Sequence, residues 1–226
     1  MEKRSKSIIE EFLHINDYKE ASHCVEELDQ GGMLDVFVRV GVETTLERNQ
    51  ITRDHMGHLF HQLLQAGILS TSQFFKGFSE TLKIADDMAI DIPYVWQYIA
   101  ELVNPVLEGG ISLRELLIEF SKPLLPVARA GILFAEILQL LCKQMSQKEV
   151  EALWRDSKLS CADFLPETVD GNFISLMKSD DLKRVELRLQ TADGLLRRNI
   201  STTREVAAGW GQVMTWKGDS LLAGFL

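Results

Sequence analysis

Apolar residues recur at steps of three and four along the first three quarters of this 226-residue chain, and this spacing limits its fold more than any other feature. Positions three and four apart share one face of an α-helix, so each set of such residues marks one amphipathic helix. The sets are Ile8, Ile9, Phe12 and Leu13; Leu34, Phe37, Val38 and Val42; Leu59, Leu63 and Leu64; Phe74, Phe78 and Leu82; Val95, Ile99, Leu102, Val103 and Val106; Leu113, Leu116, Leu117 and Phe120; Ile132 to Leu141; and Val150, Leu153 and Trp154. The pattern predicts one helix after another.

The expected helix starts carry matching capping residues. Four segments have the spacing of a capping box, in which the first side chain accepts from a free N–H of the first turn and the fourth bonds back. They are Asp17-x-x-Glu20, Ser70-x-x-Gln73, Ser112-x-x-Glu115 and Ser146-x-x-Glu149. Glycine and proline pairs separate the sets, so short turns join the helices. The sequence therefore predicts an all-α fold, built as a stack of antiparallel helical hairpins.

One segment is ambiguous by periodicity. Val36, Val38, Val40 and Val42 also alternate as the residues of a strand would. Because no second strand lies within reach to pair with it, we interpret this segment as helix too.

Charge divides the chain into two parts. The formal net charge is −9, from 24 basic and 33 acidic residues. Residues 168–226 hold eight basic and seven acidic residues, so residues 1–167 hold the other 16 and 26 and carry a net charge of −10. We therefore expect a helical domain over residues 1–167 and a distinct tail over residues 168–226. The tail has one amphipathic stretch, Leu182 to Leu196, and we expect poor order beyond it.

The composition excludes several classes of protein. An acidic chain is a poor electrostatic match for phosphate backbones, so nonspecific nucleic-acid binding is not expected. Cys24, Cys142 and Cys161 are far apart, which argues against a disulfide framework or a structural zinc site. The N-terminus lacks the apolar run of a secretory signal, and the longest apolar stretch is too short to span a bilayer. We expect a cytoplasmic protein with no membrane partner.

Catalytic motifs are missing from the sequence. It holds no P-loop, no complete GxGxxG, no GxSxG and no HExxH motif. His55, His58 and His61 form the one histidine cluster, but steps of three spread them over about a third of a helix circumference. A shared metal ion is therefore not expected. The sequence predicts no catalytic residue, no cofactor and no enzymatic activity.

The segment from Ile84 to Tyr94 is the strongest candidate for a binding site. It joins two expected helices and holds three carboxylates, Asp86, Asp87 and Asp91, the last of them two residues before Pro93. Asp91 can be read as the N-cap of the next helix, with the proline setting φ in its first turn. Asp86 and Asp87 lie near a helix C-terminus, where the macrodipole disfavours negative charge. Such an acidic turn is a surface that a basic partner would complement, and this second reading is compatible with the first.

Several stretches of the chain resemble the MA3 (also called MI) domain. They are residues 8–21, whose sequence is IIEEFLHINDYKEA; residues 24–28; residues 37–47; and Asp91-Ile92-Pro93. The similarity is strongest to the MA3 domains of the translation-initiation scaffolds called eukaryotic translation initiation factor 4 gamma, and it covers roughly residues 5–167. It implies a stack of atypical HEAT-like hairpins. It also implies a non-enzymatic translation-initiation adaptor that binds and modulates the DEAD-box RNA helicase initiation factor 4A, contacting RNA only through that complex.

The resemblance also assigns site residues. In related MA3 domains an acidic residue, three others and then Asp-x-Pro contact the N-terminal RecA-like domain of the helicase. Here that pattern falls on Asp87, Asp91 and Pro93, and Asp86 is a neighbour with the same charge. Two alternatives remain open at this point. One is a helical-repeat RNA-binding module with a local basic patch around Lys122 and Arg129, and the other is a fragment that competes with the full scaffold.

Overall fold

The computed structural model describes residues 1–28, 32–127, 129–159 and 164, and the regular elements within them are all α-helices. These helices are α1 (Glu2–Ile15), α2 (Tyr18–Leu28), α3 (Leu34–Leu46), α4 (Gln50–Gln65), α5 (Thr71–Met88), α6 (Val95–Leu107), α7 (Leu113–Leu124), α8 (Ala130–Gln144) and α9 (Gln147–Ser157). The predicted all-α class is confirmed. The ambiguous valines of residues 36–42 lie within α3, so the helical interpretation of that segment is confirmed as well.

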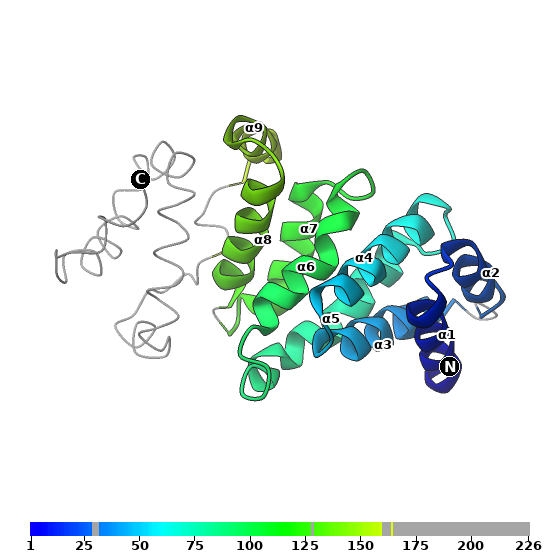
Figure 1. Ribbon diagram of the computed structural model, residues 1–226. Helices are drawn as coiled ribbons and strands as arrows, with labels where there is room; N and C mark the ends of the chain where they lie inside the picture. Colours follow the sequence, from blue (N-terminus) through cyan, green and yellow to red (C-terminus); the bar gives the residue numbers. More distant parts are fainter. Residues whose placement is uncertain (29–31, 128, 160–163, 165–226) are drawn as a thin grey trace, which may run out of the picture.

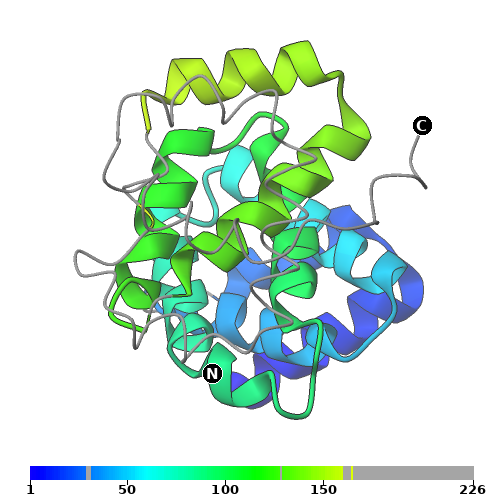
Figure 2. The same cartoon turned by 90° about the vertical axis from the view of Figure 1, so that its left-hand side faces the viewer.

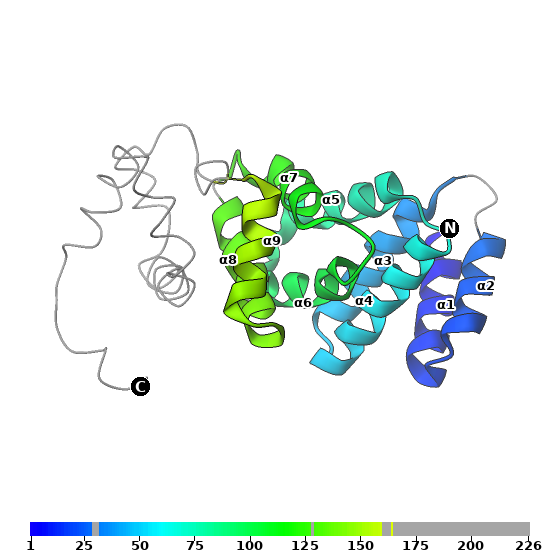
Figure 3. The same cartoon turned by 90° about the horizontal axis from the view of Figure 1, so that it is seen from above.

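The helices form a stack of hairpins in two layers (Figure 1). In one layer α3 packs against α1 and α5, and α5 packs against α7; in the other α4 packs against α6, and α6 against α8. Figure 3 shows the hairpins following one another from α1–α2 at one end to α8 and α9 at the other. Turns within hairpins, such as the one between α5 and α6, therefore share one edge of the stack, and turns between hairpins share the opposite edge. The end formed by α8 and α9 faces the viewer in Figure 2.

Two glycines allow neighbouring hairpins to approach closely. A Cβ atom on Gly57 of α4 would lie 2.5 Å from the carbonyl oxygen of Leu102 in α6. A Cβ on Gly77 of α5 would lie 2.5 Å from the carbonyl oxygen of Asp35 in α3. Because real side chains do not make such contacts, the helix spacing in both layers depends on hydrogen atoms at these two positions.

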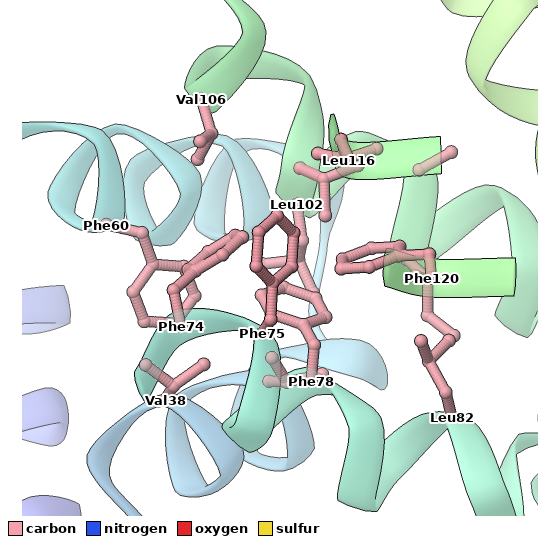
Figure 4. Packing of buried hydrophobic residues seen from close by; sticks show 14 of the residues in the cluster. Val38, Phe60, Phe74, Phe75, Phe78, Leu82, Leu102, Val106, Leu116 and Phe120 are labelled. Carbon is pink, nitrogen blue, oxygen red and sulfur yellow. The ribbon is translucent and has the colours of Figure 1, made fainter. Parts of the chain in front are cut away.

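Phenylalanines fill the space between the layers in the middle of the stack (Figure 4). The Phe74 and Phe78 rings lie 4.8 Å apart between centroids, and Phe60 meets both of them edge-on at 5.9 Å. Phe120 of α7 joins the group, 5.1 Å from Phe78 and 5.9 Å from Phe75. Aromatic pairs at such distances stabilise a core beyond the area that they bury. This cluster fixes α4, α5 and α7 relative to one another.

The predicted caps are found at the helix starts. Ser70 and Ser146 each form a complete capping box, with Gln73 and Glu149 bonding back to the cap. The Ser112 hydroxyl accepts from the amide of Glu115. Asp17 Oδ1 accepts from the Lys19 and Glu20 amides and so opens α2. Asn49 caps α4 in the same way, by accepting from the Thr52 amide.

The expectations for the tail lie outside the described residues. They are the boundary at residue 167, the amphipathic helix over residues 182–196 and the poor order beyond it.

Candidate protein-binding site at the α5–α6 turn

Backbone hydrogen bonds shape the connection between α5 and α6, at the lower edge of the stack in Figure 1. The amides of Asp91 and Ile92 both bond to the carbonyl oxygen of Met88, at 3.1 and 2.8 Å. The Ile90 amide bonds to the carbonyl of Asp87 at 3.2 Å. These bonds satisfy carbonyl groups at the end of α5 that the helix itself leaves open. The connection is therefore a structured turn.

Two buried apolar side chains hold this turn onto the core. Ala85, in the last turn of α5, and Ile92, just before α6, are both buried. The carboxylates of Asp87 and Asp91 lie between these anchors and are exposed, and Pro93 is exposed beside them. Within the described residues, no hydrogen bond or ion pair joins either carboxylate to a side chain. The sequence-predicted residues are thus brought together on one exposed turn.

The expected N-cap role of Asp91 is wrong. Helix α6 begins at Val95, and its N-cap is Tyr94, whose side chain makes no capping hydrogen bond. Pro93 lies in the turn before the helix, where the amide of Val95 reaches back to the carbonyl of Ile92. This non-helical turn delays the helix by three residues relative to the expectation. The Asp91 carboxylate therefore does not cap α6.

Exposed apolar side chains lie close to the two carboxylates in the sequence. Ile90 is 80% exposed, and Ile84 and Tyr94 are about half exposed. Exposed large apolar residues are common singly on protein surfaces, but here three of them lie within eleven positions, next to free carboxylates. The sequence placed Ile84 and Ile90 in the segment between two helices but did not reveal their exposure, because exposure depends on how the helices pack. The turn therefore combines charge with apolar contact area.

Asp86 differs from its neighbours because it has a partner. Arg129, at the start of α8, places Nε 2.7 Å from Asp86 Oδ1, and its Nη2 donates to Oδ2 at 3.3 Å. The pair links the last turn of α5 to the α7–α8 connection, where Val127 is half exposed. The structure thus divides the three carboxylates of the turn into one that is paired and two that are not.

Lys122 and Arg129, the residues of the suggested basic patch, are each paired with a carboxylate. Lys122 pairs with Glu119 one turn earlier in α7, at 2.5 Å, and Arg129 pairs with Asp86. Each of these cations therefore has a carboxylate within contact distance. The electrostatic basis of the RNA-binding alternative is removed at these two residues.

A buried ion pair anchors α6 behind the turn. Arg53 Nε lies 2.7 Å from Glu101 Oε2, and the two side chains are only 5% and 7% exposed. Arg53 also lies over the ring of Tyr98, with 3.7 Å between Cζ and the ring centroid. The Tyr98 ring in turn meets that of Tyr94 at 6.3 Å. Contacts thus run from the core of α4 to the exposed end of the turn.

The three neighbouring histidines of α4 do not converge. His55 Nδ1 bonds to the hydroxyl of Tyr18 at 2.7 Å, whereas His58 Nδ1 lies 2.9 Å from the carbonyl oxygen of Asp54. His61 lies beside Gly110 at the far end of the helix. In the part of the chain that the structure describes, no three metal-ligating side chains gather into a possible site.

A pocket of about 420 Å³ lies at the opposite edge, among α6, α7, α8 and α9. Its lining mixes apolar residues such as Leu107 and Leu141 with Arg114 and two serines, Ser112 and Ser157. Both hydroxyls are engaged locally, because Ser112 caps α7 and Ser157 donates to the carbonyl of Trp154. Arg114 is also occupied, since it donates to the Ser157 carbonyl at 2.6 Å. The described lining thus offers no activated nucleophile.

Stacked helical hairpins define a helical-repeat domain, and this one carries an exposed acidic turn. The sequence profile of the MA3 domain matches residues 1–112, which hold α1 to α6 and the whole acidic turn. The chain belongs to the MA3 family, and the resemblance seen in the sequence is confirmed. Within the described residues, no helix is long and apolar enough to cross a membrane.

Comparison with individual relatives shows which members of the family this chain is similar to. The chain is 69% identical over 182 residues to human eukaryotic translation initiation factor 4 gamma 3, an alignment that covers 80% of this chain and 12% of that protein. It is 54% identical over 180 residues to mouse eukaryotic translation initiation factor 4 gamma 1, covering 79% of this chain and 11% of that one. An Arabidopsis thaliana protein named MA3 domain-containing translation regulatory factor 3 is 28% identical over 110 residues, covering 49% of this chain and 16% of that protein. The chain thus spans about an eighth of the length of the initiation factors that it matches, and it is similar to a domain-sized part of those scaffolds.

Proposed function

We propose that this chain is a non-enzymatic adaptor domain of cytoplasmic translation initiation, and that it binds the N-terminal RecA-like domain of the DEAD-box helicase initiation factor 4A. One observation carries the proposal. Asp87 and Asp91 are exposed on a turn that backbone bonds and buried anchors hold in place, and neither has a cation partner among the described residues. A preformed pair of free carboxylates loses little entropy when it meets a basic surface.

The charge and shape of the turn support a protein partner over a small ligand. Charge-assisted hydrogen bonds from Arg or Lys to the two carboxylates would give specificity and fast association. The exposed side chains of Ile84, Ile90 and Tyr94 would add apolar contact around those bonds. Pro93 fixes the backbone where the turn leaves for α6, which lowers the ordering cost of binding.

The effect on the helicase follows from binding one of its two RecA-like domains. A partner that binds one arrangement of the two domains better than the other shifts the equilibrium between open and closed forms. The domain would thereby modulate the ATP-driven cycle of the helicase and would meet RNA only through that complex.

Reversing both free charges tests this proposal. We expect Asp87→Lys with Asp91→Lys to weaken binding to the isolated RecA-like domain by about ten-fold or more, the scale of losing one or two charge-assisted contacts. Isothermal titration calorimetry measures the affinity, and circular dichroism checks that the helices are intact. Since neither carboxylate caps a helix, the fold should survive the change.

The chain offers a matched control on its opposite edge. Glu108 and Asp156 are exposed, line the pocket there and have no ion pair among the described residues. Glu108→Lys with Asp156→Lys makes the same change in net charge, and we expect it to leave the affinity within about two-fold. Equal losses in the two variants would mean that overall charge matters and the acidic turn does not.

A further inference from the structure

Asp86 and Arg129 connect two turns that are 43 positions apart in the sequence. Two contacts join their side chains: Arg129 Nη2 donates a hydrogen bond to Asp86 Oδ2 at 3.3 Å, and Nε lies 2.7 Å from Oδ1 without the geometry of a hydrogen bond. Arg129 is 18% exposed and Asp86 is 46% exposed, so water screens this pair less than it does a pair at the open surface. The backbone of Arg129 is fixed as well, because its amide bonds to the carbonyl of Leu124 at the end of α7.

Each of the two charges lies at the end of its helix that disfavours it. Asp86 is in the last turn of α5, where the macrodipole favours cations, and Arg129 is the N-cap of α8, where it favours anions. Neither residue therefore stabilises its own helix through the dipole. The unfavourable placements offset each other only because the two side chains meet, which indicates a role for the contact itself.

The contact also joins the segment that matches the MA3 profile to the hairpin beyond it. Asp86 lies within residues 1–112, whereas Arg129 lies outside them. Position 86 is directly before Asp87 and two residues before Met88, whose carbonyl oxygen holds the turn in shape. Restraining Asp86 therefore restrains the end of α5, the part of a helix that otherwise frays first.

We propose that the Asp86–Arg129 pair is a clamp that positions the acidic turn, and that Asp86 acts through this clamp and is not itself a partner contact. The inference rests on the proposed function for its effect on binding. Asp87 and Asp91 then meet the partner's basic side chains, while Arg129, contributed by the next hairpin, is a positioning residue for both.

A single variant and a charge-swapped variant distinguish a positioning role of Asp86 from a direct contact with the partner. Arg129→Gln should weaken binding to the RecA-like domain roughly three- to ten-fold, because the turn must be ordered on binding. The charge-swapped protein, Asp86→Arg/Arg129→Asp, should recover most of that loss, because the swap restores the pair and places each charge at the helix end that favours it. Lys122→Gln is the matched control, since the ion pair of Lys122 among the described residues lies within α7 and the change in net charge is the same.

A direct contact role for Asp86 predicts the opposite results. Arg129→Gln would then free the Asp86 carboxylate and leave the affinity unchanged or higher, and the charge-swapped protein would bind far more weakly. Either result would overturn the clamp.

Amide hydrogen exchange tests the clamp without the helicase. The Ile90, Asp91 and Ile92 amides donate the bonds that shape the turn. We expect their hydrogens to exchange faster in Arg129→Gln and at close to the wild-type rate in the charge-swapped protein. Unchanged exchange would overturn the clamp whatever the binding result. If the wild-type chain does not bind the helicase but the hydrogen-exchange rates change as expected, the proposed function fails and the clamp stands.

Discussion

Arg53 and Asp87 illustrate how burial decides what a charged residue does in this chain. The Arg53 guanidinium is buried, and it meets the Glu101 carboxylate, two backbone carbonyls and the face of Tyr98. Gln97 completes the group by donating to the other Glu101 oxygen at 2.9 Å. Asp87 is exposed, and no side chain among the described residues pairs with it. The first charge therefore holds α4 to α6, and the second is available to a partner.

Removing one member of the buried pair should be costly. We expect Arg53→Met to lower the free energy of unfolding by about 3–5 kcal/mol, because it leaves the Glu101 carboxylate buried without its cation. Urea denaturation followed by circular dichroism measures the change. Arg48→Met, which breaks the exposed pair with Glu10, is the control and should cost about 1 kcal/mol or less.

The double replacement Arg53→Met/Glu101→Leu checks the cause of that loss. Since it removes both charges, it should be more stable than Arg53→Met alone. If the two proteins unfold at the same urea concentration, lost packing of the arginine and not the unpaired carboxylate explains the effect.

The helix ends show where local chemistry decides an element and where it does not. Ser70 and Ser146 cap α5 and α9 as their spacing predicts, because a capping box needs only residues within one turn. Asp91 has an equally suitable side chain but caps nothing, since the chain around Pro93 makes a further turn before α6 begins. The start of a helix can thus be predicted from the sequence where the cap is local. The prediction fails where a preceding turn sets the boundary.

Acid should loosen the start of α9 specifically. Hydrogen bonds from the hydroxyl and then the amide of Ser146 lower the pKa of Glu149 below its ordinary value. A depressed carboxyl pKa means that this stabilisation is present above the unfolded-state pKa and is lost as the pH falls through the folded-state pKa. We expect the protection factors of the Glu149 and Val150 amides to fall across that acid window, as measured by hydrogen exchange.

Glu149→Gln provides the comparison for this acid effect. Its amide oxygen can still accept from the Ser146 groups but does not titrate, so protection at the start of α9 should stay constant over the same pH range. A parallel fall in both proteins would show that general acid unfolding and not the capping box is responsible.

At the scale of the whole molecule, the two edges of the stack have different characters. The turn between α5 and α6 lies at one edge of the stack (Figure 1). The segment around it carries the two carboxylates without a partner among the described residues, the exposed apolar side chains and the Asp86–Arg129 pair. At the opposite edge, Ser112, Arg114 and Ser157 of the pocket are engaged in helix caps and end contacts, but Glu108 and Asp156 are exposed carboxylates there too. The first edge differs because the highly exposed Ile90 lies between its two carboxylates in the chain, which suits the basic partner proposed above.

The sequence predicted the features that depend on near neighbours. Apolar spacing predicted the helices other than α2, whose start only the capping pattern at Asp17 indicated, and the acidic residues of the turn were evident from their order in the chain. The pairing of Asp86 with Arg129 could not be predicted, because it depends on how two hairpins pack across 43 positions. For the same reason the sequence suggested a basic patch around Arg129 and did not reveal its carboxylate partner. The exposure of Ile90 also follows from tertiary packing and not from its apolar character.

The most direct test of the account is a calorimetric titration of the wild-type chain into the N-terminal RecA-like domain of initiation factor 4A at two salt concentrations. The account predicts saturable binding that weakens as the salt concentration rises, because exposed carboxylates on the chain meet cations on the partner. The absence of binding by a folded chain, or binding with the same affinity at both salt concentrations, would contradict it.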